Sequence, residues 1–333
     1  MKVAVVGATG AVGETILRVL EERAFPVERL GAFASRGRVG AVRFRGELHD
    51  VHVTTYEGLA AYDVVLFAGG DDASKDYGRA LAEAGKLVAD NSSTYRMEPD
   101  IPLVVPDVNS HALGDARLAP VANCSTIQLV YALKPIRDVA GLRSVRVASY
   151  QSVSGAGRPA LERLEAEERA VHGGALESEV TPFPAAIARN VIPQIGSFDD
   201  AGSCTEEKKI VEETRKILEL PSLHVAATTV RVPVRYAHSE AVFVETERET
   251  SVSELSSAIA AQPGVRLVPS GIVTPRDVEG QDTVYVARVR AEDGSRRHFQ
   301  LWVVGDNLRV GAATTAVRLA ELMLAAGVPA GGA

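Results

Sequence analysis

The first 120 residues alternate short apolar runs with stretches of helical periodicity, and this alternation constrains the fold more than any other feature of the sequence. We expect helices over 11–23 and 72–84. Strands joined by helices need crossover connections, which place the strands parallel in one sheet with helices on both faces. The pattern predicts a doubly wound α/β domain with an added hairpin over 38–55 and with buried strands at 2–8, 30–35, 63–70, 87–93 and 103–109.

The pattern changes after about residue 140. Apolar and helical runs there predict strands in 142–154, 224–246, 283–290 and 298–304, and helices over 158–171 and 205–218. Long strands in this mixture indicate an antiparallel α+β domain. The last helix, 312–326, is apolar on most faces, so we expect it to pack back onto the first domain. The predicted domains are therefore 1–123 plus 312–330, and 124–311.

The composition is that of an ordinary globular protein, with 46% hydrophobic residues, 24% charged residues and a net charge of −7. Mild acidity without a basic cluster argues against nucleic acid or an anionic membrane as a partner. No apolar run reaches membrane-spanning length, and the N-terminus reads as a strand with no secretory leader. Two cysteines cannot form a disulfide framework or a zinc site of the usual spacing, so we expect a cytoplasmic protein without a bound metal.

The sequence GATGAVG, residues 7–13, follows the first predicted strand and opens the first predicted helix. Gly7 permits a tight turn, Gly10 lets a pyrophosphate approach the backbone, and Gly13 lets helix and strand pack closely. The helix N-terminus offers N–H groups and a positive dipole end to phosphates. The motif predicts a Rossmann-type dinucleotide-binding domain; the alternative is a tight turn without a ligand. The predicted cofactor contacts are Gly7, Thr9, Gly10, Ala11, Val12 and Gly13.

The end of the second strand bears on the choice between NAD and NADP. An acidic residue at this place would bind the ribose 2′-hydroxyl of NAD. The sequence here is FASRGR, with Ser35 and Arg36 and no acid, which suits a 2′-phosphate. We therefore expect NADP, with Ser35 and Arg36 as contacts. The alternative is that Arg36 and Arg38 are solvated surface charges.

Cys124 lies at a predicted strand-to-helix junction, between Asn123 and the pair Ser125 and Thr126. Small polar residues are typical of a helix start. A thiol there meets the positive end of the helix dipole and exposed N–H donors, which lower its pKa and can bind an oxyanion. With a nicotinamide nearby, such a thiolate predicts an acylating aldehyde dehydrogenase. The alternative is a small core residue, and we interpret Cys204 as incidental.

Eight motifs occur in the order found in aspartate-semialdehyde dehydrogenases: GATGAVG, NSSTYRM, LVVPDVN, NCSTIQ, SYQSVSGAG, EEKKIVEETRKI, RVPVRYAHSEAV and DNLRVGAA. The chain resembles this family over residues 1–320. The resemblance implies a Rossmann-type NADP-binding domain and an α+β substrate and dimerisation domain. It also implies reversible NADP-dependent reductive dephosphorylation of L-4-aspartyl phosphate to L-aspartate 4-semialdehyde and phosphate. This step leads toward diaminopimelate and lysine, and toward threonine and methionine.

The resemblance also implies the catalytic residues. Cys124 is expected to form the aspartyl thioester, and Gln151 to orient the acyl group. His238 suits a general acid/base because imidazole exchanges protons near neutral pH. A lone strand histidine with satisfied hydrogen bonds is the alternative for His238.

Three charged groups of the substrate need partners. The resemblance implies that Arg231 binds the carboxylate, for which a planar guanidinium is suited. It implies that Glu207 meets the ammonium group. It also assigns phosphate binding to Lys209 and Arg96, from the two domains, with Asn123 as a further donor. The alternative for the helix that carries Glu207 and Lys209 is a solvated charged face.

Further cofactor contacts are implied by the same resemblance. Ser154 and Gly155 are expected to line the nicotinamide pocket, where a missing side chain permits close approach. Asn307 is expected to close over the cofactor. The sequence ASRGRVG departs from the ASxRSAG that the family often has, which leaves use of both NAD and NADP open.

Three other functions remain open at this point. N-acetyl-γ-glutamyl-phosphate reductase has a PGCYPT-like cysteine context, absent here, and glyceraldehyde-phosphate dehydrogenase usually has SCTTN. A non-catalytic NADP-binding sensor would not need its nucleophile. The strand-rich second domain predicts a homodimer, because two-fold pairs are the commonest assembly; a tetramer is the alternative.

Overall fold

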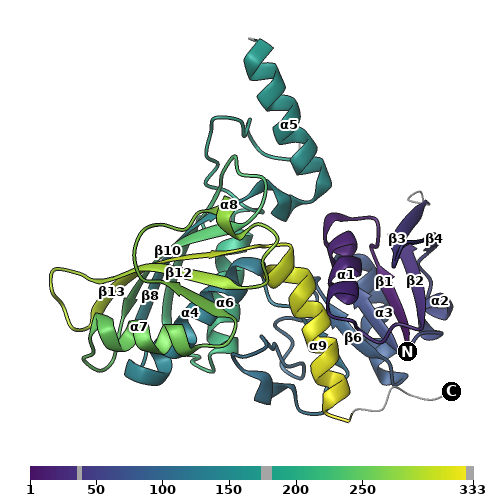
Figure 1. The fold of residues 1–333 in the computed structure, drawn as a ribbon, viewed down its shortest axis with the longest axis horizontal. Helices are drawn as coiled ribbons and strands as arrows, with labels where there is room; N and C mark the ends of the chain where they lie inside the picture. Colours follow the sequence, from purple (N-terminus) through teal and green to yellow (C-terminus); the bar gives the residue numbers. More distant parts are fainter. Residues whose placement is uncertain (36–39, 174–181, 328–333) are drawn as a thin grey trace. The chain divides into compact units, whose positions relative to one another are not determined.

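The computed structural model describes residues 1–35, 40–173 and 182–327 (Figure 1). Arg36, expected to contact the cofactor, lies outside these ranges. The chain divides into two compact units. Unit 1 comprises Met1–Asn123 and the chain from Gly311 onward, and unit 2 comprises Cys124–Val310. The chain therefore leaves unit 1 once and returns to it near its end.

Unit 1 contains a seven-stranded sheet in the order β3-β4-β2-β1-β5-β6-β7. All neighbouring strands are parallel except β3 and β4, which form the expected antiparallel hairpin. The strands are β1 (Lys2–Val6), β2 (Arg29–Ala34), β3 (Ala41–Phe44), β4 (Glu47–Val53), β5 (Val64–Phe67), β6 (Leu87–Asp90) and β7 (Leu118–Pro120). The connecting helices are α1 (Ala11–Glu22), α2 (Tyr56–Ala60), α3 (Asp71–Glu83) and the 3-10 turn η1 (Ser110–Leu113).

The C-terminal helix α9 (Thr314–Ala325) follows a short π-helical turn, η3 (Arg309–Ala313), and belongs to unit 1. It packs on β5, β6 and α1 through buried residues that include Val317, Leu319 and Met323. Arg23 of α1 binds the Glu321 carboxylate, with its Nε 2.8 Å from Oε1. These contacts confirm the expected return of the last helix to the first domain.

Unit 2 contains a six-stranded sheet in the order β11-β12-β13-β10-β8-β9. Its strands are β8 (Ser144–Gln151), β9 (His224–Arg231), β10 (His238–Glu245), β11 (Val265–Val268), β12 (Val284–Ala291) and β13 (His298–Gly305). The central pairs are antiparallel, as expected, but β9 runs parallel to β8 and β11 parallel to β12. The sheet is therefore mixed, because both outer strands are reached through helical connections.

Helices α4 (Cys124–Ala140), α6 (Thr205–Ile217) and α7 (Val252–Ala261) pack on this sheet and lie below it in Figure 1. The strand residues that face them alternate with more exposed ones, as in β8, where Val145, Val147, Ser149 and Gln151 are buried. The other elements are η2 (Val153–Ala156), α5 (Arg158–Gly173) and α8 (Pro275–Val278). The more exposed strand residues lie on the opposite face of the sheet, which α4, α6 and α7 do not cover.

The strand predicted over 103–109 is wrong. Asn109 binds the backbone there through its side chain, accepting from the N–H of Val105 at 2.8 Å and donating to the carbonyl of Leu103 at 3.0 Å. Asp107 has φ +65°, and the Val105 carbonyl accepts the Val108 N–H at 3.0 Å, which closes a turn. Because these local bonds use the backbone groups, the last parallel strand is β7 instead.

Helix α4 begins at the predicted helix start, Cys124, and continues through Pro135 to Ala140, because its buried face is apolar and outweighs one missing backbone donor. α7 and β11 were not expected from the sequence. No helix in the described part of the chain is long and apolar enough to cross a membrane.

Candidate active site in unit 2

Cys124 is the first residue of α4, and its side chain is half-buried. The first-turn N–H groups of a helix have no partners within the helix, and the helix dipole is positive at that end. Both favour a thiolate over a thiol. The sequence prediction that Cys124 begins a helix is therefore confirmed.

Arg231 ends β9 and lies opposite Gln151, the last residue of β8. Its guanidinium is buried, and its Nη1 donates to the carbonyl of Ser152 at 2.7 Å. Burial lowers the pKa of Arg231, while negative charge at Glu206 and at Cys124 acts in the opposite direction. The structure thus brings the predicted carboxylate-binding arginine within electrostatic reach of the predicted nucleophile.

Gln151 connects Arg231 to helix α6. Its Nε2 lies 3.2 Å from the Oγ of Ser149 and 3.2 Å from the Oε1 of Glu206. Glu206 is buried in the first turn of α6, and its Oε2 lies 3.7 Å from the Nζ of Lys209. Glu206 thus contacts both Gln151 and Lys209, and Arg231 is the strand neighbour of Gln151, an arrangement that suits a small substrate with both signs of charge.

Glu207, predicted to meet the substrate ammonium, is not brought to this cluster. Its Oε2 accepts the Cys204 N–H at 2.9 Å, and its Oε1 accepts the Thr229 N–H at 3.0 Å. Glu207 thus forms a capping box with Cys204 and ties α6 to β9. The sequence contains a difference between the two acids. Glu207 stands three residues after the helix N-cap, which is the position of the acid in a capping box. Glu206 and Lys209 are three residues apart, so they share a helix face.

His238 begins β10 and is completely buried. Burial, followed by the positive charge of Arg231, lowers the pKa of His238 to about 3. Its Nδ1 accepts the backbone N–H of Ser152 at 3.0 Å, and its Nε2 has no hydrogen-bond partner among the described residues. Gly155 is close by, because an added Cβ would lie 3.2 Å from that Nε2 and 3.0 Å from the Nη1 of Arg231.

Asn307 and Ser154 belong to the surroundings of His238. The Oδ1 of Asn307 accepts from the hydroxyls of Ser152 and Ser154 at 3.1 Å each and from the N–H of Ala237 at 3.0 Å. All three side chains are buried. These bonds use the Asn307 oxygen within the protein, so a contact from Asn307 to a cofactor stays a prediction that concerns its amide nitrogen.

Sequence reasoning missed a second buried acid, Glu240, on the same face of β10 as His238. Glu240 has 0% exposure, and neither carboxylate oxygen has a hydrogen-bond partner among the described residues. Burial raises the pKa of Glu240 well above 4.5; the nearby Gln128 amide lowers it and the Glu206 charge raises it further. The sequence could have indicated Glu240, because it stands two residues after His238 in a predicted strand. Residues two apart in a strand face the same side of the sheet.

In unit 1 the glycine motif has the geometry expected of it. Gly7 has φ +79°, and its carbonyl accepts the Gly10 N–H at 3.0 Å, which closes the turn after β1. A Cβ on Gly13 would lie 2.2 Å from the Gly7 carbonyl oxygen, so helix and strand pack too closely for any side chain there. Gly10 is the N-cap of α1, and Thr9, Ala11 and Val12 are half-buried around it. A helix start with a glycine N-cap, which lets the backbone be approached closely, fits a dinucleotide pyrophosphate.

The other predicted site residues of unit 1 lie on loops after strands. Ser35 is exposed directly after β2. Arg96 is buried in the loop after β6, where its Nη2 donates to the Asn91 carbonyl at 2.9 Å. Asp90 holds that loop by accepting the Ser92 N–H at 2.8 Å. Asn123 is buried directly before Cys124, and no group of acidic, histidine or cysteine residues in the described ranges could hold a metal ion.

Two family models match the chain. The dimerisation domain of semialdehyde dehydrogenase matches residues 133–310, and the NAD binding domain of semialdehyde dehydrogenase matches residues 2–116. Unit 1 therefore carries a NAD-binding domain, and unit 2 a dimerisation domain, of this kind.

Full-length relatives agree with these models. The aspartate-semialdehyde dehydrogenase of Aquifex aeolicus is 43% identical over 98% of this chain and 99% of its own length. The crystal structure of aspartate semialdehyde dehydrogenase II from Vibrio cholerae is 41% identical, covers 97% of this chain and 98% of its own, and has a TM-score of 0.91. The same Vibrio enzyme complexed with ASA gives a TM-score of 0.90 at 42% identity, with the same coverage of both chains. Because its similarity to these enzymes spans both units, the chain belongs to the aspartate-semialdehyde dehydrogenase family of oxidoreductases.

Proposed function

We propose that this enzyme converts L-4-aspartyl phosphate reversibly to L-aspartate 4-semialdehyde and phosphate through a thioester on Cys124, with NADP as its cofactor. The observation that carries the proposal is the position of Cys124 at the start of α4, in the electrostatic field of the buried Arg231. A thiolate at a helix N-terminus is a competent nucleophile toward an acyl carbon. NADPH, when bound, supplies the hydride for reduction.

The substrate is an α-amino acid, and its two charged groups need opposite partners. Arg231 binds the carboxylate, because its planar guanidinium can donate two parallel hydrogen bonds. Glu206 binds the ammonium group, in place of the Glu207 expected from the sequence, since Glu206 faces Gln151 and Glu207 is occupied by two backbone N–H groups. The complex of the Vibrio cholerae relative with ASA supports this class of substrate.

The phosphate requires cations. In unit 2 Lys209 is the phosphate ligand, held 3.7 Å from Glu206 and partly exposed. In unit 1 Arg96 is proposed to bind phosphate as well, and Asn123 to donate a hydrogen bond. Gln151 orients the acyl group by a hydrogen bond from its amide.

The assignment of NADP as the cofactor rests on the residues that follow β2. Ser35 is the last described residue there, and FASRGR has no acid to bind a ribose 2′-hydroxyl. This composition supports NADP over NAD. Gly7, Gly10 and Gly13 would hold the pyrophosphate against α1, and Ser154, Gly155 and Asn307 are proposed to contact the nicotinamide half.

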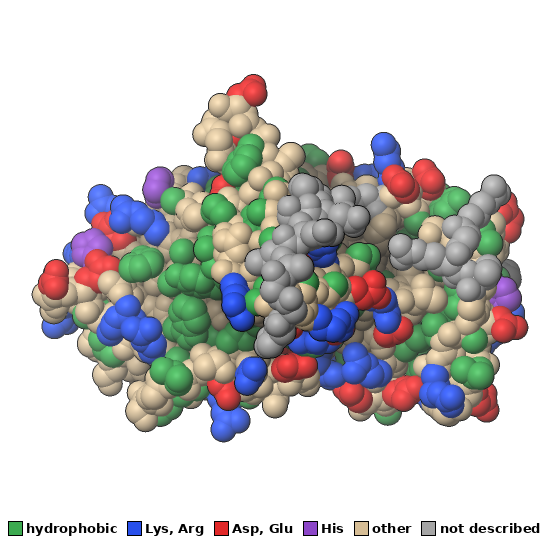
Figure 2. Space-filling model, turned by 90° about the horizontal axis from the view of Figure 1, so that it is seen from above, with side chains coloured by type: hydrophobic (Ala, Val, Ile, Leu, Met, Phe, Trp, Pro, Cys, Tyr) green, Lys and Arg blue, Asp and Glu red, His purple; other side chains and the backbone are tan. Residues whose placement is uncertain are grey.

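A homodimer is proposed to form through the open face of the unit 2 sheet. Tyr150 and Phe243 point to this face with 39% and 38% exposure, and the Tyr150 and Trp302 rings lie 5.6 Å apart. Figure 2 looks onto the side away from α4, α6 and α7, where hydrophobic side chains gather. Contiguous exposed apolar side chains of this kind mark protein interfaces, and the match to a dimerisation domain supports the same reading.

The experiment that tests the proposal follows NADPH formation from NADP⁺, aspartate semialdehyde and phosphate. We expect turnover that needs phosphate, is faster with NADP⁺ than with NAD⁺, and is absent from Cys124→Ala. Cys204→Ser is the matched control, because Cys204 is buried and serine also serves as a helix N-cap. N-acetylglutamate semialdehyde tests the ammonium requirement. Turnover by Cys124→Ala, or a preference for the N-acetylated substrate, would contradict the proposal.

A further inference from the structure

The loop that follows β6, residues 91–96, starts at the edge of the unit 1 sheet where the carboxyl ends of the parallel strands lie. Ligands of open α/β sheets bind at this edge. The loop is tied to the neighbouring strand end, because the backbone N–H and the Nδ2 of Asn91 donate to the carbonyl of Phe67 at 3.0 and 2.8 Å. Arg96, proposed above as a phosphate ligand, lies at the far end of this short loop.

Asp90, the last residue of β6, is completely buried directly before the loop. Its Oδ1 accepts the N–H of Ser92 at 2.8 Å, and its Oδ2 accepts the hydroxyl of Ser92 at 2.7 Å. The hydroxyl of Ser74, near the start of α3, donates to the same Oδ2. Asp90 therefore joins the loop to helix α3 through one carboxylate.

Ser92 passes this connection on to the middle of the loop. The N–H of Thr94 lies 3.2 Å from the Ser92 Oγ. An amide nitrogen can only donate, so the hydroxyl accepts from Thr94, and its own proton is left for the Asp90 carboxylate. Ser92 is itself buried. The bonds from Asp90 to Ser92 and from Ser92 to Thr94 thus fix consecutive parts of the loop backbone.

Tyr95 anchors the end of the loop to the same helix. Its hydroxyl donates to the Ser74 carbonyl at 2.9 Å and accepts the N–H of Arg79 at 3.2 Å. Helix α3 has no side chain where the ring packs, because a Cβ on Gly78 would lie 2.9 Å from the Cε2 of Tyr95. The residue directly before Arg96 therefore cannot shift without losing these contacts.

The guanidinium of Arg96 is held by its own loop. Its Nη2 donates to the Asn91 carbonyl at 2.9 Å, and the residue is buried. An arginine that binds an anion loses rotamer freedom, and a side chain that is oriented beforehand loses less of it. The shape of the loop therefore sets both the place and the direction of this cation.

The carboxylate of Asp90 can support the loop without being the anion that Arg96 binds. Burial raises the pKa of Asp90, while the hydrogen bonds from Ser74 and Ser92 and the positive charge of Arg96 lower it. Hydrogen bonds to a carboxylate stabilise its charge in a buried place. Because these bonds come from serine groups, the support for the loop does not depend on an ion pair with Arg96.

We infer that Asp90, Ser92 and Ser74 are positioning residues that hold loop 91–96 in the shape in which Arg96 binds phosphate. The inference rests on the proposed function, in which Arg96 is a phosphate ligand, and names the residues through which unit 1 orients it. The alternative is that the same bonds only stabilise the packing of α3 on β6, and the experiments separate the two.

The first experiment measures KM values in the assay with NADP⁺, aspartate semialdehyde and phosphate. Asp90→Asn keeps the size of the side chain but puts an NH₂ group in place of an accepting oxygen, and Ser92→Ala removes only a hydroxyl. We expect the KM for phosphate to rise about 10-fold in each, because a misplaced arginine loses a charge-assisted hydrogen bond. The KM values for aldehyde and NADP⁺ should stay within about twofold of wild type. Equal rises in all three KM values would overturn the inference.

Asp63→Asn is the matched control. Asp63 directly precedes β5 in the same sheet, at the end of the parallel strands opposite the loop, and its Oδ2 accepts the N–H of Lys2 at 2.8 Å. The variant therefore also weakens a carboxylate-to-backbone bond in unit 1. We expect it to keep the wild-type KM for phosphate even where thermal unfolding shows a loss of stability. A rise equal to that of Asp90→Asn would overturn the inference.

A double-mutant cycle tests whether Asp90 acts through Arg96. Arg96→Ala should raise the KM for phosphate about 100-fold, as expected for the loss of a hydrogen bond to a charged group. Asp90→Asn in that background should change the KM by less than about twofold, because no arginine is left to position. A further rise of about 10-fold in the double variant would overturn the inference.

Hydrogen exchange of the Thr94 amide gives a measurement that does not need turnover. We expect faster exchange in Asp90→Asn and Ser92→Ala than in wild type, and no change in Asp63→Asn. Unchanged exchange in every variant would overturn the inference. Wild-type turnover that does not need phosphate would contradict the proposed function instead, while the exchange rates would still decide whether Asp90 holds the loop.

Discussion

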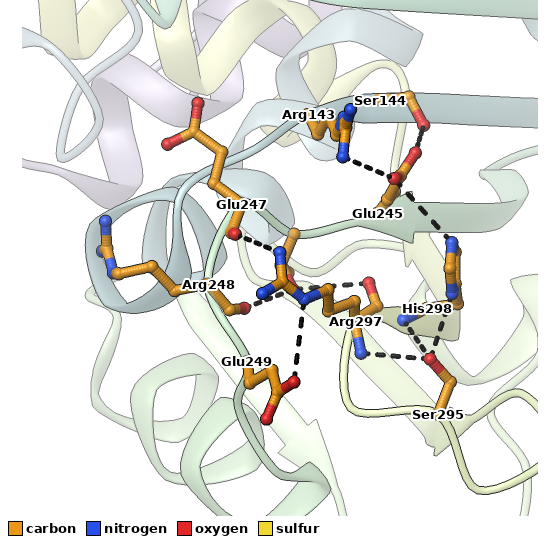
Figure 3. Close-up of polar contacts among 10 residues, drawn as sticks. Arg143, Ser144, Glu245, Glu247, Arg248, Glu249, Ser295, Arg297 and His298 are labelled. Carbon is orange, nitrogen blue, oxygen red and sulfur yellow. Dashed lines mark hydrogen bonds and ion pairs between the residues drawn. The ribbon is translucent and has the colours of Figure 1, made fainter.

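The titratable side chains at the two ends of strand β10 are in opposite environments, buried at one end and partly exposed at the other. At its start His238 and Glu240 are completely buried, and burial lowers the pKa of His238 and raises the pKa of Glu240, so that it favours the neutral form of each. At its end Glu245 is partly exposed, with the Nη1 of Arg143 at 3.6 Å, the Oγ of Ser144 at 3.1 Å and the Nε2 of His298 at 3.9 Å (Figure 3). One strand thus carries hydrogen-bonding chemistry at one end and solvent-screened ion pairs at the other.

This difference shows that charge pairing alone does not identify a functional region. The region in Figure 3 has more ion pairs and backbone contacts, including the bond from the Nη1 of Arg297 to the Glu247 carbonyl at 2.7 Å. Exposed pairs of this kind contribute little, because water and salt screen them. The buried end instead contains polar atoms that have no hydrogen-bond partner among the described residues, including His238 Nε2 and both carboxylate oxygens of Glu240.

The sharpest test of the comparison places the same charge at both ends. Glu240→Lys puts an ammonium into a site with 0% exposure, and we expect a loss of about 3–5 kcal/mol in unfolding free energy. Glu245→Lys removes the pairing with Arg143 and should cost less than about 1 kcal/mol. Thermal and urea unfolding of the two variants measure this. Equal losses would show that the two ends are not different environments.

The next test compares neighbouring acids. Glu206→Gln should raise the KM for aspartate semialdehyde about 10–100-fold, because it removes the charge proposed to meet the ammonium group. Glu207→Gln should leave the KM within about twofold and cost about 1 kcal/mol of stability through the capping box. Steady-state kinetics and thermal unfolding of both proteins decide it. The reverse pattern would restore Glu207 as the substrate ligand.

A third test uses pH at the buried end. The pKa of Glu240 is raised in the folded state, so the folded protein holds a proton that the unfolded chain releases above about 4.5. Stability from this group is therefore present at low pH and is lost as pH rises toward the folded pKa, by at most about 1.4 kcal/mol per pH unit. Glu240→Gln keeps the neutral shape without titrating. We expect its melting temperature to exceed that of wild type by a margin that grows from pH 5 to pH 8, and a constant margin would contradict this.

The smallest effect is expected at the exposed end. Glu245→Gln should lower stability by less than about 1 kcal/mol in low salt, and the difference should vanish at high salt because the pairs are screened. Turnover should not change. A salt-resistant loss larger than this would mean that Glu245 is tied to the rest of the sheet more firmly than its exposure indicates.

Local patterns in the sequence predicted much of the fold. Gly7 and Gly13 met strict backbone requirements, a positive φ and a close helix–strand contact, and such requirements leave few other residues possible. The strand over 103–109 failed because apolar composition does not show that Asn109 binds the backbone through its side chain. Helix α4 continues through Pro135 because the burial of its apolar side chains outweighs the low helix propensity of proline.

The candidate site was predictable where one residue type suits one task, as at Cys124 and Arg231. Glu206, which we propose as the ammonium ligand, was not distinguished from Glu207 in the sequence, because two adjacent acids look equivalent in a motif and differ in the helix face they occupy. The surroundings of His238 include a hydrogen bond from the backbone N–H of Ser152, and every residue except proline has such a group. Such a contact has no signature in side-chain sequence.

The return of α9 to unit 1 has a consequence for how the protein is made. Unit 2 is one continuous stretch, Cys124–Val310, whereas unit 1 needs α9, near the end of the chain. During synthesis all the residues of unit 2 leave the ribosome before α9 does. Domains generally fold as units from the N-terminus onward, but here the surfaces of β5, β6 and α1 stay uncovered until α9 has been translated. The nucleotide-binding unit is therefore the last to be completed, and a prematurely terminated chain would contain a finished dimerisation sheet without a finished nucleotide-binding unit.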